Sequence, residues 1–366
     1  MGLEWKTGFE IELLAPRGLT RFDLASRVAR RRGGSVRRFF HPQQEPGGAD
    51  GQAIFENLTP GFEALDSEGR PLARFVDDVT LQADFDRKAA ALSGWYRILT
   101  DDGRLLRLIA RTCDPDAPLD RVLAPIAALF GTTAEMHASG MVKVSDERDV
   151  SVAIAAPLPG ERERACEIVT PPLDRDQEAV LGFLLGEAAA AGFTCPREGA
   201  THVHFDATPL LSARTIANLV AVLSRHGDAL KRLVGTNPHC IRLGKWPDRL
   251  LALAATEGFA ALDWPAARKE LSTVGLTKHC DFNLLNLVSA NKAKHTFEVR
   301  ILPSSLDPTA IVEAAELFAA ILEWCINHPV VAPRGQEDVA ALLSSIPLRT
   351  KGRTHWLQSA AGMFDR

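Results

Sequence analysis

Three short segments alternate between bulky apolar and ionisable residues, and this alternation constrains the fold more than any other feature of the chain. They are Gly8–Leu13 (GFEIEL), Thr201–Asp206 (THVHFD) and Phe297–Ile301 (FEVRI). Because successive side chains of a β-strand point to opposite faces, each segment would bury an apolar face and present two ionisable groups on the other. These groups are Glu10 with Glu12, His202 with His204, and Glu298 with Arg300.

A fourth segment, Cys166–Pro172 (CEIVTPP), places Glu167 in a strand that two prolines stop. If all four segments line one concave sheet, four carboxylates converge with one or two imidazoles. A pocket holds so many like charges only with divalent cations. Oxygen-rich ligands favour Mg²⁺ or Mn²⁺ over zinc, and the nearby Arg300 would suit a phosphate.

The rest of the pattern predicts an α+β fold with a largely antiparallel sheet, because strands and helices alternate without a regular βαβ order. Strands are expected at 8–14, 150–156, 165–170 and 201–206, and helices at 20–32, 175–190, 211–234, 308–327 and 336–345. Segments 282–289 and 295–302 are interpreted as a hairpin around Asn291–Lys292, and 41–51 as a loop. Without repeats or a low-complexity linker, we expect one domain over residues 1–350 and a C-terminal tail at 351–366.

The overall charge argues against nucleic-acid or membrane partners. The formal net charge of the 366-residue chain is −4, and charged residues make up 24%. This balance gives no general attraction to nucleic acid or anionic lipid. The apolar 308–325 stretch is interrupted by three glutamates, and the N-terminus does not resemble a signal peptide. The six cysteines form no CxxC pair. We therefore expect a cytoplasmic protein whose cysteines are mostly buried.

Two other classes of function remain open from the residues alone. A metal-dependent hydrolase could use His202 and His204, although it would usually have further His or Asp ligands at strand ends. A non-catalytic binding protein could keep the same fold, although it would then have lost part of the ligating set. No GxxxxGK[ST] or GxGxxG motif occurs, so a P-loop or Rossmann nucleotide site is not expected.

The order of the motifs GFEIEL, CEIVTPPL, THVHFD, FNLLNL and FEVRILPSSLD resembles the putative amidoligase family, over about residues 8–310. This family belongs to the glutamine synthetase and glutamate–cysteine ligase superfamily of COOH–NH₂ ligases. The resemblance implies a curved antiparallel sheet of the glutamine-synthetase type, with helices on its convex side. Its concave face would hold ATP and two or three Mg²⁺ or Mn²⁺ ions. Residues 1–350 would then form a single catalytic domain.

The resemblance also implies a reaction: ATP phosphorylates a carboxylate, and an amine displaces phosphate to form an amide or isopeptide bond. Glu12 and Glu167 would hold the metal near the carboxylate substrate, and Glu10, His202 and Glu298 the metal that bridges the ATP phosphates. Arg300 would stabilise the transferring γ-phosphoryl group. His204 would contact phosphate or orient a neighbour. Asn286 matches the asparagine that precedes the last catalytic strand.

The substrates stay open at this point. No segment matches the ammonia-site loop of the superfamily, and the 36–60 segment is particular to this chain's subgroup. Relatives suggest amino acids, peptides or cell-wall fragments as carboxylates and amines, and a partner amidotransferase as an alternative source of ammonia. We expect the side chains of Arg242, Lys245 and Lys278 to be solvated at the surface. The alternative is that they bind phosphate or a substrate carboxylate.

Overall fold

The computed structural model describes residues 3–44, 56–240, 242–289, 295–329 and 338–364. The chain forms two compact units. Unit 1 comprises Met1–Ile11, Pro172–Leu185 and Gly199–Arg366, and unit 2 comprises Glu12–Pro171 and Gly186–Glu198. Strand β1 (Thr7–Leu14) and helix α4 (Gln177–Ala190) contribute residues to both units.

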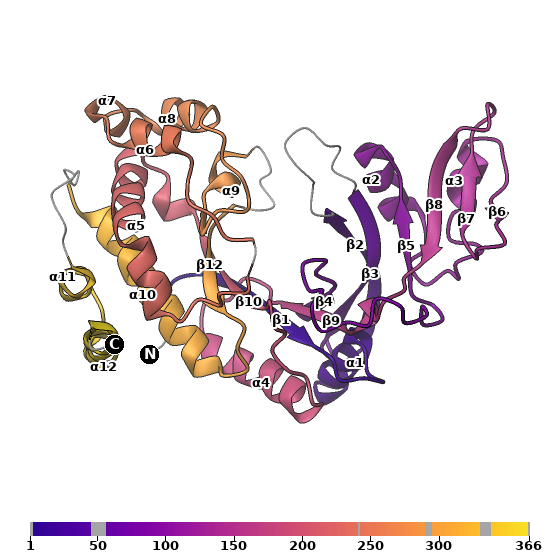
Figure 1. Cartoon of the computed structure of the whole chain (residues 1–366), viewed down its shortest axis with the longest axis horizontal. Helices are drawn as coiled ribbons and strands as arrows, with labels where there is room; N and C mark the ends of the chain where they lie inside the picture. Colours follow the sequence, from indigo (N-terminus) through magenta and orange to yellow (C-terminus); the bar gives the residue numbers. More distant parts are fainter. Residues whose placement is uncertain (1–2, 45–55, 241, 290–294, 330–337, 365–366) are drawn as a thin grey trace. The chain divides into compact units, whose positions relative to one another are not determined.

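The strands of unit 1 lie in the order β11 (Phe282–Asn283), β12 (Thr296–Pro303), β10 (Ala200–Asp206) and β1, and neighbours are antiparallel. Apolar side chains of these strands are fully buried on one face of the sheet. Examples are Phe9 on β1, Val203 on β10 and Val299 on β12. Helix α10 (Pro308–Asn327) packs against β10 and β12, and α5 (Ala213–Leu233) packs against α10 (Figure 1). The ionisable residues alternate with this core.

The other described helices of unit 1 are shorter. They are α6 (Asp248–Ala254), α7 (Glu257–Ala260), α8 (Trp264–Leu271), α9 (Leu285–Val288), α11 (Val339–Ser345) and α12 (Thr350–Phe364), with a 3₁₀ turn at Thr208–Leu210. Helices α6 and α7 pack on α5, and α12 packs on both α5 and α10. The segment that was expected to be a tail therefore contains a helix that packs on this unit.

In unit 2, β1 is followed across the sheet by seven strands. Their order is β9 (Ala165–Val169), β4 (Pro71–Val76), β3 (Glu56–Leu65), β5 (Tyr96–Leu99), β8 (Ser151–Pro157), β7 (Val142–Ser145) and β6 (Glu135–Met136). Strand β2 (Val36–Gln44) also pairs with β3. Helix α1 (Arg21–Arg31) packs on β3 and β4, α2 (Gly103–Thr112) on β3, and α3 (Ala124–Leu129) on β7. A 3₁₀ turn at Arg162–Arg164 precedes β9.

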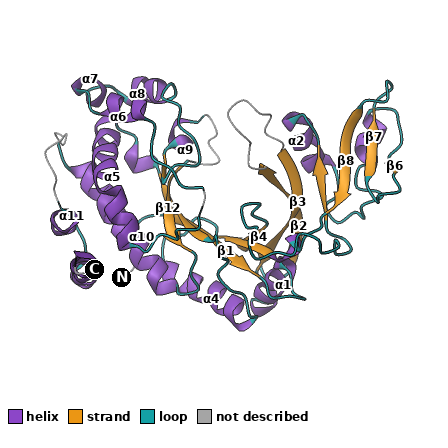
Figure 2. Cartoon of the chain, viewed as in Figure 1, coloured by secondary structure: helices purple, strands orange, loops and turns teal. Residues whose placement is uncertain are grey.

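The predicted class is confirmed at the level of a mixed α and β fold with a large, open antiparallel sheet (Figure 2). The strands predicted at 8–14, 150–156, 165–170 and 201–206 are present, as are all five predicted helices, within a few residues of the expected ends. At the start of α1, Thr20 forms a capping box with Asp23, the local signal on which that helix prediction depends. The glutamine-synthetase-type fold stays a prediction.

Two details of the prediction are wrong. Residues 41–44, expected in a loop, extend β2, because each of them lies opposite a residue of β3. Pro42 is compatible with this strand because, among the described strands, β2 pairs with β3 alone. The first arm of the predicted hairpin ends at Asn283, whose side-chain oxygen accepts a hydrogen bond from the Leu285 backbone N–H (2.8 Å), and helix α9 follows. The expected turn at Asn291–Lys292 lies outside the described residues.

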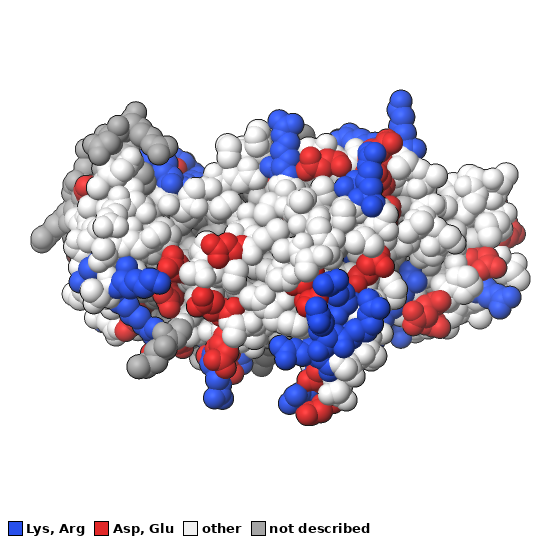
Figure 3. All heavy atoms as spheres, turned by 90° about the horizontal axis from the view of Figure 1, so that it is seen from below, with Lys and Arg blue, Asp and Glu red and all other residues white. Residues whose placement is uncertain are grey.

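Three arginines near the N-terminus form ion pairs with carboxylates of unit 2. Arg27 and Arg31 lie 2.5 and 2.9 Å from the Glu187 carboxylate, and Arg37 pairs with Glu63. On the face drawn in Figure 3, basic side chains gather in places with acidic side chains beside them. Four of the six cysteines are buried, as expected. Among the described helices, none combines the length and apolar character that crossing a bilayer requires.

Candidate active site

Three neighbouring strands of unit 1 bring the predicted ionisable pairs together. Glu10 on β1 lies opposite His202 on β10, and His204 lies opposite Glu298 on β12. Directly opposed residues of antiparallel strands project from the same face, with Cβ atoms about 4.5–5.5 Å apart. The two-residue period of each strand and the register between strands therefore place these four groups on one face of the sheet.

An irregularity in β12 lies beside this group. Thr201 pairs with Leu302 and Val203 with Val299, so Arg300 and Ile301 together oppose the single residue His202. Such a bulge bends a strand and redirects its side chains. Ile301 and Leu302 are consecutive and both buried. In a regular strand, one of them would point to the face that carries the ionisable groups. The Arg300 guanidinium donates through Nη1 to Glu298 Oε1 at 2.6 Å.

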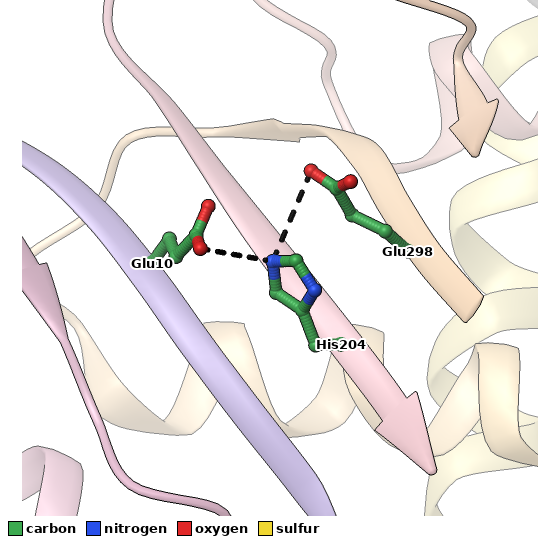
Figure 4. A group of neighbouring side chains, drawn as sticks. All are labelled: Glu10, His204 and Glu298. Atoms are coloured by element: carbon green, nitrogen blue, oxygen red, sulfur yellow. Dashed lines mark ion pairs between the residues drawn. The ribbon is translucent and has the colours of Figure 1, made fainter. Parts of the chain in front are cut away.

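Two imidazoles share two carboxylates. His204 Nε2 lies 3.3 Å from Glu10 Oε1 and 3.8 Å from Glu298 Oε1 (Figure 4). His202 Nδ1 lies 3.2 Å from Glu10 Oε2 and 3.5 Å from Glu298 Oε1. His202 and Glu298 are buried, while Glu10 and His204 are half-buried. The four side chains thus form one compact cluster that is partly shielded from solvent.

The electrostatics of the cluster keep both carboxylates ionised. Burial by itself would raise the pKa of Glu10, but His204 and His202 outweigh it and hold that pKa well below its usual value. Burial and the nearby Glu10 charge act in the same direction on Glu298. There, His204, Arg300 and His202 outweigh them and lower the pKa of the Glu298 carboxyl. The cluster therefore offers anionic oxygen ligands at neutral pH.

The donor atoms fit a divalent cation. One ligand atom each from Glu10, His204 and Glu298 lie within 4.8 Å of one another. Carboxylate oxygens with an imidazole nitrogen suit Mg²⁺ or Mn²⁺, whose ligands lie about 2.1 Å from the ion and therefore a few ångströms from one another. His204, predicted to contact phosphate or orient a neighbour, is thus placed where it could itself be a metal ligand.

Two residues that the sequence did not single out support this cluster. Asn283 donates through Nδ2 to Glu298 Oε2 at 2.7 Å, and its own oxygen is fixed by the Leu285 N–H. Thr296 Oγ1 lies 3.2 Å from His204 Nδ1. Asn286, predicted at the cofactor, lies on α9 and donates to the same Thr296 hydroxyl at 3.4 Å. Asn286 is thus one step removed from the histidine.

The remaining predicted ligands, Glu12 and Glu167, belong to unit 2. Glu12 is buried near the end of β1, and Glu167 is half-buried in β9, the neighbouring strand of the sheet. Of the predicted site residues, unit 1 contains Glu10, His202, His204, Asn286, Glu298 and Arg300, and unit 2 contains Glu12 and Glu167.

A cluster of this kind, with anionic oxygen and imidazole donors beside an arginine on an antiparallel sheet, is a candidate site for a metal ion. A family model described as "Putative amidoligase enzyme" matches residues 3–322. The chain belongs to this amidoligase family, which confirms the resemblance seen in its motifs. No curated protein matches the chain.

Replacing Asn283 by alanine is expected to weaken Mn²⁺ binding about 10- to 100-fold, the usual cost of losing a side chain that orients a metal ligand. The reason is that Glu298 Oε2 would lose its amide donor while the ligands themselves remain. Free Mn²⁺ measured by electron paramagnetic resonance during a titration checks this. Asn237→Ala, which removes an amide that donates to the Gly199 backbone oxygen outside the cluster, is the matched control and should change affinity less than about threefold. Equal losses in the two variants would contradict the role of Asn283.

Proposed function

We propose that this protein is an ATP-dependent, ADP-forming carboxylate–amine ligase that makes an amide or isopeptide bond through an acyl phosphate. One observation carries the proposal: two ionised carboxylates, two imidazoles and a guanidinium cluster on one sheet face of an amidoligase-family chain. Anionic ligands beside a fixed cation suit a polyphosphate chain brought in with its metal ions. ATP and Mg²⁺ or Mn²⁺ are the cofactors that this arrangement fits.

Glu10, His202 and Glu298, together with His204, would hold the metal at the ATP phosphates. When bound, such an ion neutralises phosphate charge and polarises the phosphoryl oxygens. The protein's part is to fix the donors. Cross-strand pairing sets their spacing, and Asn283 and Thr296 hold the Glu298 and His204 side chains by hydrogen bonds. We propose Glu12 and Glu167, on neighbouring strands of unit 2, as ligands of a second metal near the carboxylate substrate.

Arg300 is proposed to stabilise the phosphoryl group during transfer. Its guanidinium carries five N–H donors in a planar fork, so one nitrogen can hold Glu298 while others bind phosphoryl oxygens. The 2.6 Å bond to Glu298 fixes the fork in place before substrate binds. Such a pre-positioned cation is the main means by which proteins accelerate phosphoryl transfer.

The proposed reaction has two steps. A carboxylate oxygen attacks the γ-phosphorus, the bond to the β-phosphate oxygen breaks, and ADP leaves. The amine nitrogen then attacks the acyl carbon, loses a proton, and releases inorganic phosphate that carries one former carboxylate oxygen. In the first step, Arg300 would stabilise the negative charge of the transferring phosphoryl group. The substrates are proposed to be small-molecule or peptide carboxylates and amines, with a partner amidotransferase as an alternative source of ammonia.

The proposal is tested by screening for ADP release. Purified protein with Mg²⁺ and ATP is incubated with pairs drawn from a panel of carboxylates (amino acids, short peptides and peptidoglycan fragments) and amines, including ammonia. We expect ADP formation that requires one particular carboxylate and yields an equal amount of amide. Amide hydrolysis without nucleotide would instead identify a metal-dependent hydrolase. If the protein binds ATP and metal ions but converts none of the pairs, the result would favour a binding protein.

A further inference from the structure

Two arginines of unit 2 share one buried carboxylate. Arg74 on β4 donates through Nε to Glu63 Oε1 at 2.9 Å, and Arg37 on β2 donates through Nη2 to Glu63 Oε2. Glu63 lies between them on β3 and is 4% exposed, whereas the side chains of Arg74 and Arg37 are 56% and 65% exposed. Burial alone would raise the pKa of Glu63, but hydrogen bonds from the two arginines outweigh it and lower that pKa. The three side chains therefore carry one positive charge in excess.

The register between strands places this arginine pair on the same face of the sheet as Glu167. Arg74 lies opposite Glu63 on β3 and opposite Val169 on β9. Glu167 precedes Val169 by two residues on β9. Directly opposed residues share a face, and so do residues two apart on one strand. Arg74 and Glu167 are therefore diagonal neighbours about 7–8 Å apart, close enough for one small molecule to contact both side chains.

An aromatic ring helps to fix the position of Arg74. Phe39 on β2 lies opposite Gly61, and a Cβ at Gly61 would lie 2.6 Å from Phe39 Cζ, so the ring rests against the backbone of β3. The Arg74 guanidinium lies 5.2 Å from the centre of this ring, a cation–π contact. Within the described residues, Nε is the only nitrogen of Arg74 that donates a hydrogen bond. Its Nη1 and Nη2 groups therefore remain to donate to a ligand.

The charge and geometry of the pair favour a carboxylate as that ligand. Two parallel N–H groups of a guanidinium match the two oxygens of a carboxylate or of a phosphate. One positive charge in excess balances one carboxylate, whereas a phosphate monoester brings about 1.5–2 negative charges to a place already occupied by Glu63. Because Glu63 and Phe39 restrain Arg74 in advance, binding loses less side-chain freedom.

We propose that Arg74 and Arg37 bind a second carboxylate of the carboxylate substrate, which is therefore a dicarboxylic acid or a peptide with two carboxylates. Arg74 donates through Nη1 and Nη2, and Arg37 contributes its remaining N–H groups. This inference rests on the proposed ligase function, in which the first carboxylate lies near the metal held by Glu12 and Glu167. The two arginines would select the substrate and take no part in phosphoryl transfer.

The test measures binding without nucleotide, so its result does not depend on ligase activity. Ligand-observed NMR on the full chain with Mg²⁺ gives the Kd of glutarate and of its monoamide, glutaramate, which has the same length but one carboxylate. Glutarate should bind at least about fivefold more tightly, since a hydrogen-bonded charge pair at a partly exposed position is worth about that factor. Equal Kd values for the two compounds would overturn the proposal, even if the screen for ADP release identifies a ligase.

One variant and a matched control locate the second carboxylate. Arg74→Gln should raise the Kd of glutarate to about that of glutaramate, and it should stay folded because Arg74 is exposed and Arg37 keeps Glu63 paired. Arg70→Gln removes an exposed arginine that pairs with Asp66 on the turn between β3 and β4, and it should leave the ratio of the two Kd values unchanged.

A ratio that persists in Arg74→Gln would refute the site. A phosphate Kd that is lower than that of glutarate and is raised by Arg74→Gln would identify a phosphate site and would also overturn the proposal. If the ratio is lost in Arg74→Gln but no pair of substrates releases ADP, the ligase function fails and the dicarboxylate site stands.

Discussion

Arg300→Lys is expected to lower the rate of ADP formation at least about 100-fold, equivalent to about 2.7 kcal/mol of transition-state stabilisation. Arg300 is nearly buried, and its Nη1 donates to Glu298. The direction of its other N–H groups is therefore fixed. Lysine keeps the charge but offers a single ammonium, which cannot hold Glu298 and two phosphoryl oxygens together. The loss should therefore fall on the transfer step.

The measurement is single-turnover ADP formation with the carboxylate and amine identified by the screen. Binding of ATP with Mg²⁺ should change less than about threefold, because the proposed metal ligands remain. Arg242→Lys is the matched control: it changes an arginine that also contributes to the charge around His279 near Arg300. It should retain the rate within about twofold. If Arg300→Lys turns over at the normal rate, Arg300 is a structural partner of Glu298 and the assignment is withdrawn.

Glu298→Gln is expected to reduce the affinity for ATP in the presence of Mg²⁺ at least about 100-fold. Glu298 is the buried carboxylate that both imidazoles and Arg300 share. Glutamine keeps the shape and one oxygen, but it removes the charge that a hard cation requires. Loss of a side chain that only orients a metal ligand weakens metal binding about 10- to 100-fold. Loss of the ligand itself should weaken binding further.

Calorimetry with ATP, with and without Mg²⁺, separates this effect from a general loss of the nucleotide site. In EDTA, both the native protein and Glu298→Gln should bind ATP weakly and equally. The melting temperature should also fall, because the attraction of His204, Arg300 and His202 for Glu298 outweighs its repulsion by Glu10, so binding is measured well below the melting transition. Glu323→Gln controls for the change in net charge. Native affinity in EDTA equal to that in Mg²⁺ would mean that the phosphates are not held through metal ions.

The core of the site could be predicted from the sequence because a two-residue period is a property of the β-strand itself. That period alone places His202 beside His204 and Glu298 beside Arg300 on a common face. The helpers Asn283 and Thr296 could not be found this way. Their contacts depend on the register of β12 with its neighbours, and the bulge at Arg300 is not visible in the alternation. Register depends on packing between distant segments.

The organisation into units was also hidden, for a related reason. Two of the four boundaries pass through regular elements, β1 between Ile11 and Glu12 and α4 between Leu185 and Gly186. At these two boundaries no linker composition marks the division. Helix α9 was mistaken for strand because the short apolar run LLNLV satisfies either period, and the deciding contact is the Asn283 side chain.

Transfer of ¹⁸O from the carboxylate to phosphate distinguishes an acyl phosphate from the other routes. The carboxylate substrate is labelled with ¹⁸O in its carboxyl group and converted with ATP, Mg²⁺ and the amine, and the released phosphate is analysed by mass spectrometry. An acyl phosphate requires one carboxylate oxygen to leave with the phosphorus. We therefore expect one ¹⁸O atom in each phosphate formed and ADP as the nucleotide product. Unlabelled phosphate, or AMP carrying the label, would contradict it.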